Sequence, residues 1–356
     1  MNSSIRPVTI EGRYFWQGAS RFLVKGIVYQ LHRRNGASTS DPLADDGIEH
    51  LLRDLEAFKE LGLNTLFVFQ IDPTKSHDAA MKLLEDAGIY VLVICINRMA
   101  PSEMYTEELL EHFFSAIDCM AAYPNTLGVL VGNEVINDHN STAAASVIRA
   151  VTRDVKKYMT LASEASEQRI LPVGYSAVDV IMLNRSTFDY LTAGSREESI
   201  DFYCVRLFSD TDIPVFFSEY GANTVGPRLF HETRAMYSSE MTHVFSGGCV
   251  YEFYQSPSGY GIVELTENFH GTMSLHKSTE FNTLKKRLLE CVDEQPETLD
   301  LPAPDQAEAL TRPLPMPYNF WRATGELPIS PVNWEEVRSR LHLSSWVILD
   351  NGMQRR

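Results

Sequence analysis

Two stretches of the chain share one pattern, a short apolar run that ends in a carboxylate. The first, Leu127–Asn137, begins with Leu, Gly and Val residues and turns polar at Asn133 and Glu134. The second, Ile213–Gly221, is a shorter apolar run that carries Glu219 near its end. Such runs are typical of strands that are buried on both faces. We therefore expect Glu134 and Glu219 at the carboxyl ends of two parallel strands, the end at which barrels carry their active sites.

Strand and helix patterns alternate along most of the chain. For example, residues 46–61 carry apolar side chains at helical spacing, Gly62 follows, and residues 64–69 form an apolar run. The predicted strands are 22–28, 64–69, 89–96, 127–131, 170–174, 200–207, 215–218 and 248–253, and the predicted helices are 46–61, 77–87, 106–122, 141–165, 228–242 and 280–291. Alternation sustained this long predicts an α/β fold, a single (β/α)8 TIM barrel.

Both ends of the chain depart from this alternation. Residues 8–28 alternate apolar and polar side chains around a turn-like segment, which predicts an N-terminal hairpin that leads into the first strand. From Asp293 to Pro331 prolines are frequent, and Tyr318, Phe320 and Trp321 lie among them. Because large aromatic side chains are seldom left in solvent, we expect a Pro-rich C-terminal strap that packs on the barrel. The predicted organisation is a barrel at 1–292 and an extension at 293–356, with a short helix at 334–343.

Composition narrows the possible partners and the location. The net charge of -16 and the pI near 5.1 argue against a nucleic-acid partner, because phosphate binding requires a basic surface. The N-terminus lacks the basic start and apolar core of a secretory signal, and no stretch approaches the length of a membrane span. The five cysteines are odd in number and widely spaced, which favours free thiols. These features predict a cytoplasmic protein with no membrane partner, and they leave the oligomeric state open.

The sequence indicates no metal and no cofactor. Its ten histidines do not form a metal-ligand spacing with carboxylates or cysteines. Its glycines include no phosphate-binding fingerprint. The expected partner is a small-molecule or oligosaccharide substrate.

Paired carboxyl groups held at strand ends are suited to retaining glycosidic-bond chemistry. One carboxylic acid protonates the leaving oxygen, and a carboxylate about 5 Å away attacks the sugar carbon. Each glutamate alone has a structural explanation: Glu134 could favour the positive end of the helix that begins near Ser141, and Glu219 could be the buried partner of an arginine. The two together, each after an apolar strand, favour catalysis. Asn133, next to Glu134, is suited to bind a sugar hydroxyl.

Motifs in one order extend from about Phe22 to Leu289. They include Asp41–Asp45, Leu61–Thr65, Ile71–Thr74, Asp86–Tyr90, Val131–Asn137, Pro172–Ala177, Pro214–Gly221, Val244–Gly248 and Tyr260–Val263. In these motifs the chain resembles the fungal β-1,3-glucanosyltransferases of glycoside hydrolase family 72, whose members work on cell-wall glucan. The resemblance implies that Glu134 is the general acid/base, Glu219 the nucleophile, Asn133 a sugar contact and Tyr251 an aromatic residue lining the cleft.

The chain also departs from the family pattern within the expected cleft. It has Phe67-Val68-Phe69 where the family has Arg-Val-Tyr, Val28 where the family has Asp, and Arg206-Leu207-Phe208 where the family has Asn-x-Tyr. Each change removes a hydrogen-bonding group or alters the charge, so a more apolar cleft is expected. The further residues expected to contact substrate are Tyr29, Phe67, Phe69, Tyr175, Arg206 and Phe208. Arg206 is expected to approach Glu219 and keep that carboxylate ionised.

The departures leave three interpretations of function. Family positions that form disulfides are Leu51, Ala80 and Ala222 in this chain, which fits a reducing compartment. The favoured interpretation is a repurposed, diverged enzyme whose glutamate pair performs acid/base chemistry on a small, relatively apolar substrate. The alternatives are a conventional retaining β-1,3-glucanosyltransferase or glucanase and a non-catalytic binding protein. Retention of two facing carboxylates argues against the last, because their repulsion and desolvation destabilise the fold.

Overall fold

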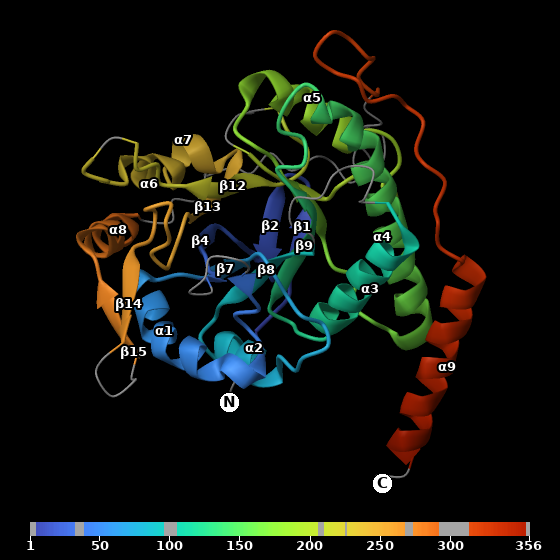
Figure 1. The fold of residues 1–356 in the computed structure, drawn as a ribbon, viewed down its shortest axis with the longest axis horizontal. Coiled ribbons are helices and arrows are strands. Elements are labelled where there is room, and N and C mark those ends of the chain that lie inside the picture. Colours follow the sequence, from blue (N-terminus) through green and yellow to red (C-terminus); the bar gives the residue numbers. More distant parts are fainter. Residues whose placement is uncertain are drawn as a thin grey trace.

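Eight parallel strands close into a barrel in the computed structural model, which describes residues 5–32, 39–95, 105–205, 210–224, 226–267, 273–291 and 313–353. The order around the barrel is β10-β11-β12-β13-β4-β7-β8-β9. These strands are β4 (Val24–Val28), β7 (Thr65–Val68), β8 (Tyr90–Ile94), β9 (Thr126–Asn133), β10 (Val173–Ser176), β11 (Phe202–Cys204), β12 (Val215–Tyr220) and β13 (Phe245–Val250). The (β/α)8 barrel predicted from the sequence is therefore confirmed (Figure 1).

Helices surround the barrel and bury one face against it. They are α1 (Ile48–Leu61), α2 (Asp78–Asp86), α3 (Glu107–Ala121), α4 (Ala145–Ser166), α5 (Ile181–Leu191), α6 (His231–Met236), α7 (Ser239–Thr242) and α8 (Thr279–Glu290). In α1, the buried side chains include Leu51, Leu55 and Phe58, which recur at helical spacing. Gly62 ends α1 with a left-handed φ of 68°, a conformation that glycine adopts without a steric cost.

Strand residues divide between two apolar layers because successive side chains point to opposite faces. Leu66 and Val68 belong to the outer cluster between the strands and the helices. Phe67, between them in β7, belongs to the inner cluster that fills the barrel. The alternation decides which residues of a strand can reach the cleft at the end of the barrel.

The N-terminal ends of the strands are closed by a three-stranded antiparallel sheet of β1 (Val8–Glu11), β2 (Tyr14–Gln17) and β3 (Ser20–Arg21). Phe15 of β2 is fully buried and lies edge-on to Phe202 and Phe216, with ring centroids 5.8 and 6.0 Å away. Phe22 packs in the same way on Tyr90 at 5.0 Å. The predicted N-terminal hairpin thus forms part of an aromatic closure of the barrel.

Several elements differ from the sequence-based expectation, including the C-terminal helix, which ends at Met353 and not at 343. Helix α5 was not predicted, because its first two residues, Ile181 and Met182, are exposed and the polar residues Asn184 and Thr187 are buried, which interrupts the apolar pattern of its inner face. The helix expected at 228–242 is two short helices, α6 and α7, separated by the extended residue Ser238. An antiparallel pair, β14 (Val263–Glu267) and β15 (Met273–Lys277), follows the last barrel strand.

The described part of the C-terminal segment lies along the outside of the helices. Trp321 is fully buried and packs on Tyr190 of α5 at 5.5 Å between ring centroids. Helix α9 (Trp334–Met353) runs beside α4, and Trp334 packs on Phe114 of α3 at 6.1 Å (Figure 1). Residues 293–312, the first part of the expected extension, lie outside the described residues.

Candidate active site

Glu134 lies directly after β9, in a left-handed backbone conformation with φ 51°. Its amide N–H donates to the carbonyl oxygen of Ser176 in β10 at 2.8 Å, so the turn stays attached to the barrel. A positive φ is strained for a residue with a long side chain, and such strain is common where a side chain must take one direction. The half-buried Glu134 carboxylate consequently projects over the barrel end rather than along the strand.

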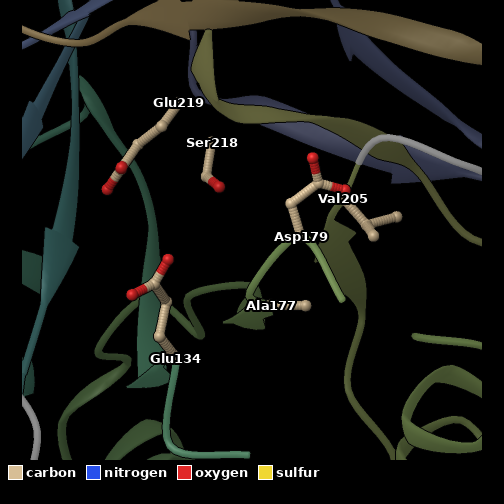
Figure 2. Close-up of a pocket in the computed structure, with 6 residues that line it drawn as sticks. All are labelled: Glu134, Ala177, Asp179, Val205, Ser218 and Glu219. Carbon is tan, nitrogen blue, oxygen red and sulfur yellow. The ribbon is translucent and has the colours of Figure 1, made fainter. Parts of the chain in front are cut away.

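Glu219 lies in β12 and faces the same pocket as Glu134. The pairing of β12 with β13 shifts register on both sides of Phe217, and Ser218 and Glu219 both line the pocket although they are consecutive. The pocket holds about 400 Å³ of open space and is lined by Glu134, Ala177, Asp179, Val205, Ser218 and Glu219. In Figure 2 the two glutamate side chains project from opposite walls toward one space. This arrangement can present an acid and a nucleophile to one substrate bond.

Asn133, the last residue of β9, is 5% exposed. Its side-chain oxygen is buried and accepts no hydrogen bond from the described part of the chain. A buried acceptor without a donor costs about 1–3 kcal/mol, so a ligand hydroxyl in that place would restore a favourable contact. The position beside Glu134 is where a sugar hydroxyl was expected from the sequence.

Tyr251, directly after β13, is half-buried near both glutamates. Burial raises the pKa of its phenol to about 12, and the negative charges of Glu252, Glu219 and Glu134 act in the same direction. The Tyr251 ring lies edge-on to the Tyr260 ring at 5.5 Å. Tyr251 therefore keeps its proton at neutral pH and can donate a hydrogen bond, but it is not among the residues that line the pocket.

Arg228, from the loop after β12, connects the two tyrosines. Its guanidinium donates to the carbonyl oxygen of Tyr251 and to that of Tyr260, the latter at 2.5 Å. It also lies over the rings of Phe230 and Tyr260, at 4.6 and 5.5 Å from the centroids. Burial lowers the pKa of Arg228 from its ordinary value, and Glu232 opposes that shift. This single cation ties three segments together at the carboxyl end of the barrel.

Four other residues predicted to contact substrate are distributed over both layers. Tyr29 and Tyr175 belong to the outer cluster and have no exposed surface. The Tyr29 hydroxyl donates to Asp54 of α1 at 2.8 Å, and the Tyr175 hydroxyl accepts from the amide of Ile136 at 2.9 Å. The structure does not bring Tyr29 or Tyr175 to the pocket, because both side chains point away from the barrel interior.

Phe67 and Phe69 point inward but do not line the pocket. Their rings are 4.9 Å apart, and both belong to the inner cluster. Phe67 has no exposed surface, whereas Phe69, nearer the carboxyl end, is 8% exposed. Arg206 and Phe208 lie outside the described residues, so the expected approach of Arg206 to Glu219 stays a prediction.

Sequence reasoning missed several polar residues at this end of the barrel. Asp179 and Ser218 line the pocket with the glutamates, Gln30 donates to Glu252, and Arg228 donates to the carbonyl oxygen of Tyr251. Ser218 belongs to the motif Pro214–Gly221, one of those that carry the family resemblance, and that was the one available signal. The others lie beyond the ends of the barrel strands.

Among the described residues, no group of three or more His, Cys, Asp or Glu side chains is placed to hold a metal ion. The five cysteines all lie in described segments and are free, with Cys95, Cys204 and Cys249 buried. No helix in the described part of the chain is both long enough and apolar enough to cross a membrane.

Comparisons with known proteins agree with the fold. A family model described as glucanosyltransferase matches residues 1–212 and 204–291. The 1,3-beta-glucanosyltransferase gel1 of Aspergillus fumigatus is 38% identical over 308 residues, which cover 79% of this chain and 65% of that protein. The 1,3-beta-glucanosyltransferase GAS2 of Saccharomyces cerevisiae is 36% identical over 365 residues, or 91% of this chain and 63% of that protein.

A solved structure of Saccharomyces cerevisiae Gas2p, in complex with laminaritriose and laminaritetraose, superimposes with a TM-score of 0.80 at 33% identity. The match covers 93% of this chain and 78% of that one. The chain thus spans about two thirds or less of the length of the curated relatives, 65% of gel1 and 63% of GAS2.

The cytoplasmic location expected from the sequence is wrong. The relatives are 1,3-beta-glucanosyltransferases, and the resemblance described above assigns to this family a substrate in the cell wall, outside the cytoplasm. The expectation rested on the ends of the chain and on its cysteines. Because the relatives are longer than this chain, its ends say nothing about a leader or an anchor.

Proposed function

The chain belongs to the glucanosyltransferase family of glycoside hydrolases, and we propose that it is a retaining β-1,3-glucanosyltransferase that cuts a β-1,3-glucan and joins one fragment to an acceptor glucan. The observation that carries the proposal is the pair of glutamates, Glu134 after β9 and Glu219 in β12, on opposite walls of one pocket. The pocket's other polar residues, Asp179 and Ser218, suit a substrate rich in hydroxyl groups.

In the first half of the reaction, the Glu219 carboxylate attacks the anomeric carbon of a glucosyl unit. The bond between that carbon and the leaving oxygen breaks, and Glu134 gives its proton to the leaving oxygen. The product is a glycosyl ester on Glu219 together with a released glucan that carries a new hydroxyl. Asn133 binds a hydroxyl of the attacked sugar through its buried side-chain oxygen.

In the second half, Glu134 acts as the base. It takes the proton from the 3-hydroxyl of an acceptor glucan while that oxygen attacks the anomeric carbon and Glu219 leaves. A β-1,3 bond forms again with the original configuration. Attack by water instead of an acceptor would make the same site a glucanase, so the ratio of the two products measures how well the acceptor is held.

The interpretation as a diverged enzyme for a small, apolar substrate finds less support than this conventional one. The relatives are named 1,3-beta-glucanosyltransferases, and solved Gas2p structures hold laminari-oligosaccharides. The aromatic replacements that suggested an apolar cleft, Phe67 and Phe69, lie in the inner cluster and do not line the pocket. The third interpretation, a non-catalytic binding protein, leaves the facing carboxylates without a purpose.

The test is incubation of the purified protein with laminaripentaose, followed by mass spectrometry of the oligosaccharides. Both longer and shorter oligomers are expected with the natural sequence and none with Glu219→Gln, which keeps the shape of the side chain but cannot attack. Shorter products alone would indicate a hydrolase. Absence of any product, or equal products from the variant, would contradict the proposal.

A further inference from the structure

Asp41, His77 and Cys119 form a row of hydrogen-bonded side chains outside the candidate active site. The Nε2 atom of His77 lies 2.7 Å from a carboxylate oxygen of Asp41, and its Nδ1 atom lies 3.3 Å from the sulfur of Cys119. The His77 side chain has no exposed surface, and that of Asp41 is 2% exposed. None of the three residues lines the pocket of Glu134 and Glu219, so the row has no part in the proposed transfer of glucan.

The Asp41 carboxylate determines which nitrogen of His77 carries a hydrogen. Two backbone amides, those of Leu43 at 2.8 Å and Asp72 at 2.7 Å, donate to its oxygens. An ionised carboxylate only accepts hydrogen bonds, so Nε2 of His77 donates to Asp41. The other ring nitrogen, Nδ1, then shares one proton with the Cys119 sulfur. It acts either as a base that accepts this proton from the thiol or as an imidazolium that donates it to a thiolate.

His77 is more basic than an isolated imidazole. Burial lowers its pKa, but the hydrogen bonds with Asp41 and Cys119 outweigh that effect and raise the pKa to about 10. A protonated histidine beside a cysteine favours the thiolate, which is the nucleophilic form. A carboxylate, an imidazole and a thiol in this order form the arrangement by which a histidine activates a nucleophile. In a purely structural role the same row would tie loops together and give Cys119 no special reactivity.

Cys119 is also placed where small molecules can reach it. It is half-buried near the end of α3, and Ser115 and Ala122, on the same face of that helix, are exposed. Cys291 is half-buried as well, but its sulfur donates to the carbonyl oxygen of Arg287 at 3.1 Å, a group that is not a base. The two half-buried thiols therefore differ in their hydrogen-bond partners, and Cys291 is an internal reference for Cys119.

A second contact holds the thiol and the imidazole in place. The Tyr123 hydroxyl, four residues after Cys119, donates at 2.9 Å to Asp78, the residue that follows His77. The two contacts tie the end of α3 to the start of α2, so the sulfur and Nδ1 stay together without a rearrangement. Asp78 is exposed, which disfavours an anionic reagent at this site and makes a neutral one the suitable probe.

We propose that Cys119 is a modification site, a nucleophilic thiol that His77 and Asp41 activate for exchange with small disulfides. The Cys119 sulfur attacks one sulfur of the disulfide, the bond between the two sulfurs breaks, and a mixed disulfide forms on Cys119. The other half leaves as a thiolate and takes the proton that Cys119 gave to His77. The small disulfide is the oxidant, and it is reduced to one thiol as Cys119 is oxidised. The site is independent of the proposed function, because no glucan takes part.

The test follows the reaction of the natural protein with neutral 2,2′-dithiodipyridine at about pH 6, where an ordinary thiol is almost entirely protonated. Absorbance of the released pyridine-2-thione gives the rates, and peptide mass mapping assigns each rate to a cysteine. Cys119 should react about ten- to a hundredfold faster than Cys291. In concentrated urea the two rates should differ less than about twofold, because unfolding separates Cys119 from His77. Equal rates in the folded protein, or a difference that persists in urea, would overturn the proposal.

His77→Gln separates activation from exposure. The glutamine amide nitrogen can still donate to Asp41, but the side chain places no base beside Cys119. The rate of Cys119 should fall at least about tenfold, toward the rate of Cys291 in the same sample. An unchanged rate in the folded variant would overturn the proposal. The comparison within the natural protein decides the question if this variant does not fold.

The matched control is Tyr123→Phe. It removes the hydrogen bond to Asp78, the other contact between the end of α3 and the start of α2, and leaves His77 in place. The rate of Cys119 should change less than about twofold, because the base is still present. A fall as large as that of His77→Gln would mean that only the packing of the two helices matters, and would overturn the proposal.

Discussion

The two ends of the barrel are made of opposite kinds of contact. At the end closed by β1–β3, aromatic rings such as Phe15 and Phe22 pack on Phe202, Phe216 and Tyr90. At the other end, the side chains of Glu134, Asp179, Ser218 and Glu219 line a pocket. The first end contributes apolar burial, and the second holds polar groups ready for a substrate.

Two features of the polar end destabilise the fold in a way that the contacts of the apolar end do not. Glu134 has a left-handed backbone, and the side-chain oxygen of Asn133 lacks a donor among the described residues. Each feature destabilises the fold by roughly 1–3 kcal/mol. Features of this kind are retained where a site must be organised before the substrate arrives. We therefore expect substitutions at the closed, apolar end to alter stability and substitutions at the polar end to alter turnover.

The largest difference between the effect on turnover and the effect on stability is expected for the two carboxylates. Glu134→Gln and Glu219→Gln should each lower glucan transfer at least about a thousandfold, because an amide neither attacks nor exchanges a proton. The melting temperature should change little, because glutamine keeps the shape of the glutamate side chain in each variant. Initial rates of laminaripentaose transfer and thermal unfolding measure the two effects. Full activity in both variants would move the active site away from this pocket.

A substitution at the closed end should alter stability and leave turnover nearly unchanged. Phe15→Ala removes a fully buried ring between Phe202 and Phe216 and should lower the free energy of unfolding by about 3–5 kcal/mol. Below the unfolding transition, kcat for transfer should change less than twofold. Denaturant unfolding and steady-state kinetics at 25 °C test this. A large fall in kcat with unchanged stability would mean that the two ends are coupled.

Some features of the polar end could be predicted from the sequence, and others could not. Apolar runs that end in an acid located Glu134 and Glu219, because strand ends and carboxylates are both local features. The face of the strand to which each side chain points was harder to predict. Val28 points into the barrel while its neighbour Tyr29 points out, and Tyr175 also faces the helices. The contact between Gln30 and Glu252 joins residues 222 positions apart, so no local pattern could reveal it.

An intermediate effect is expected at Arg228, which belongs to the polar end but serves stability as well. Arg228→Met leaves the carbonyl oxygens of Tyr251 and Tyr260 without their shared donor, which should cost about 2–3 kcal/mol of unfolding free energy. Loosening Tyr251 should also lower kcat/KM several-fold.

Arg287→Met is the matched control for that change. Arg287 donates to the carbonyl oxygen of Leu229 in the same loop, but its side chain is 24% exposed. Its loss should cost under about 1 kcal/mol and leave the kinetics unchanged. Equal losses of activity in both variants would show that the loop, and not the guanidinium of Arg228, supports the site.

The smallest effects are expected at Phe67 and Phe69, and they should locate the boundary between the apolar and the polar end of the barrel. Phe67 and Phe69 both point into the barrel, but Phe69 is closer to the pocket and keeps 8% of its surface exposed. A hydroxyl added by Phe69→Tyr can reach the cleft and should lower KM for laminaripentaose about two- to fivefold. The same hydroxyl added by Phe67→Tyr has no water and should cost about 1–3 kcal/mol of stability with no gain in KM. If KM falls in neither variant, the polar region does not extend to Phe69. A tyrosine at this position, as in the family pattern, would then make no contact with the sugar.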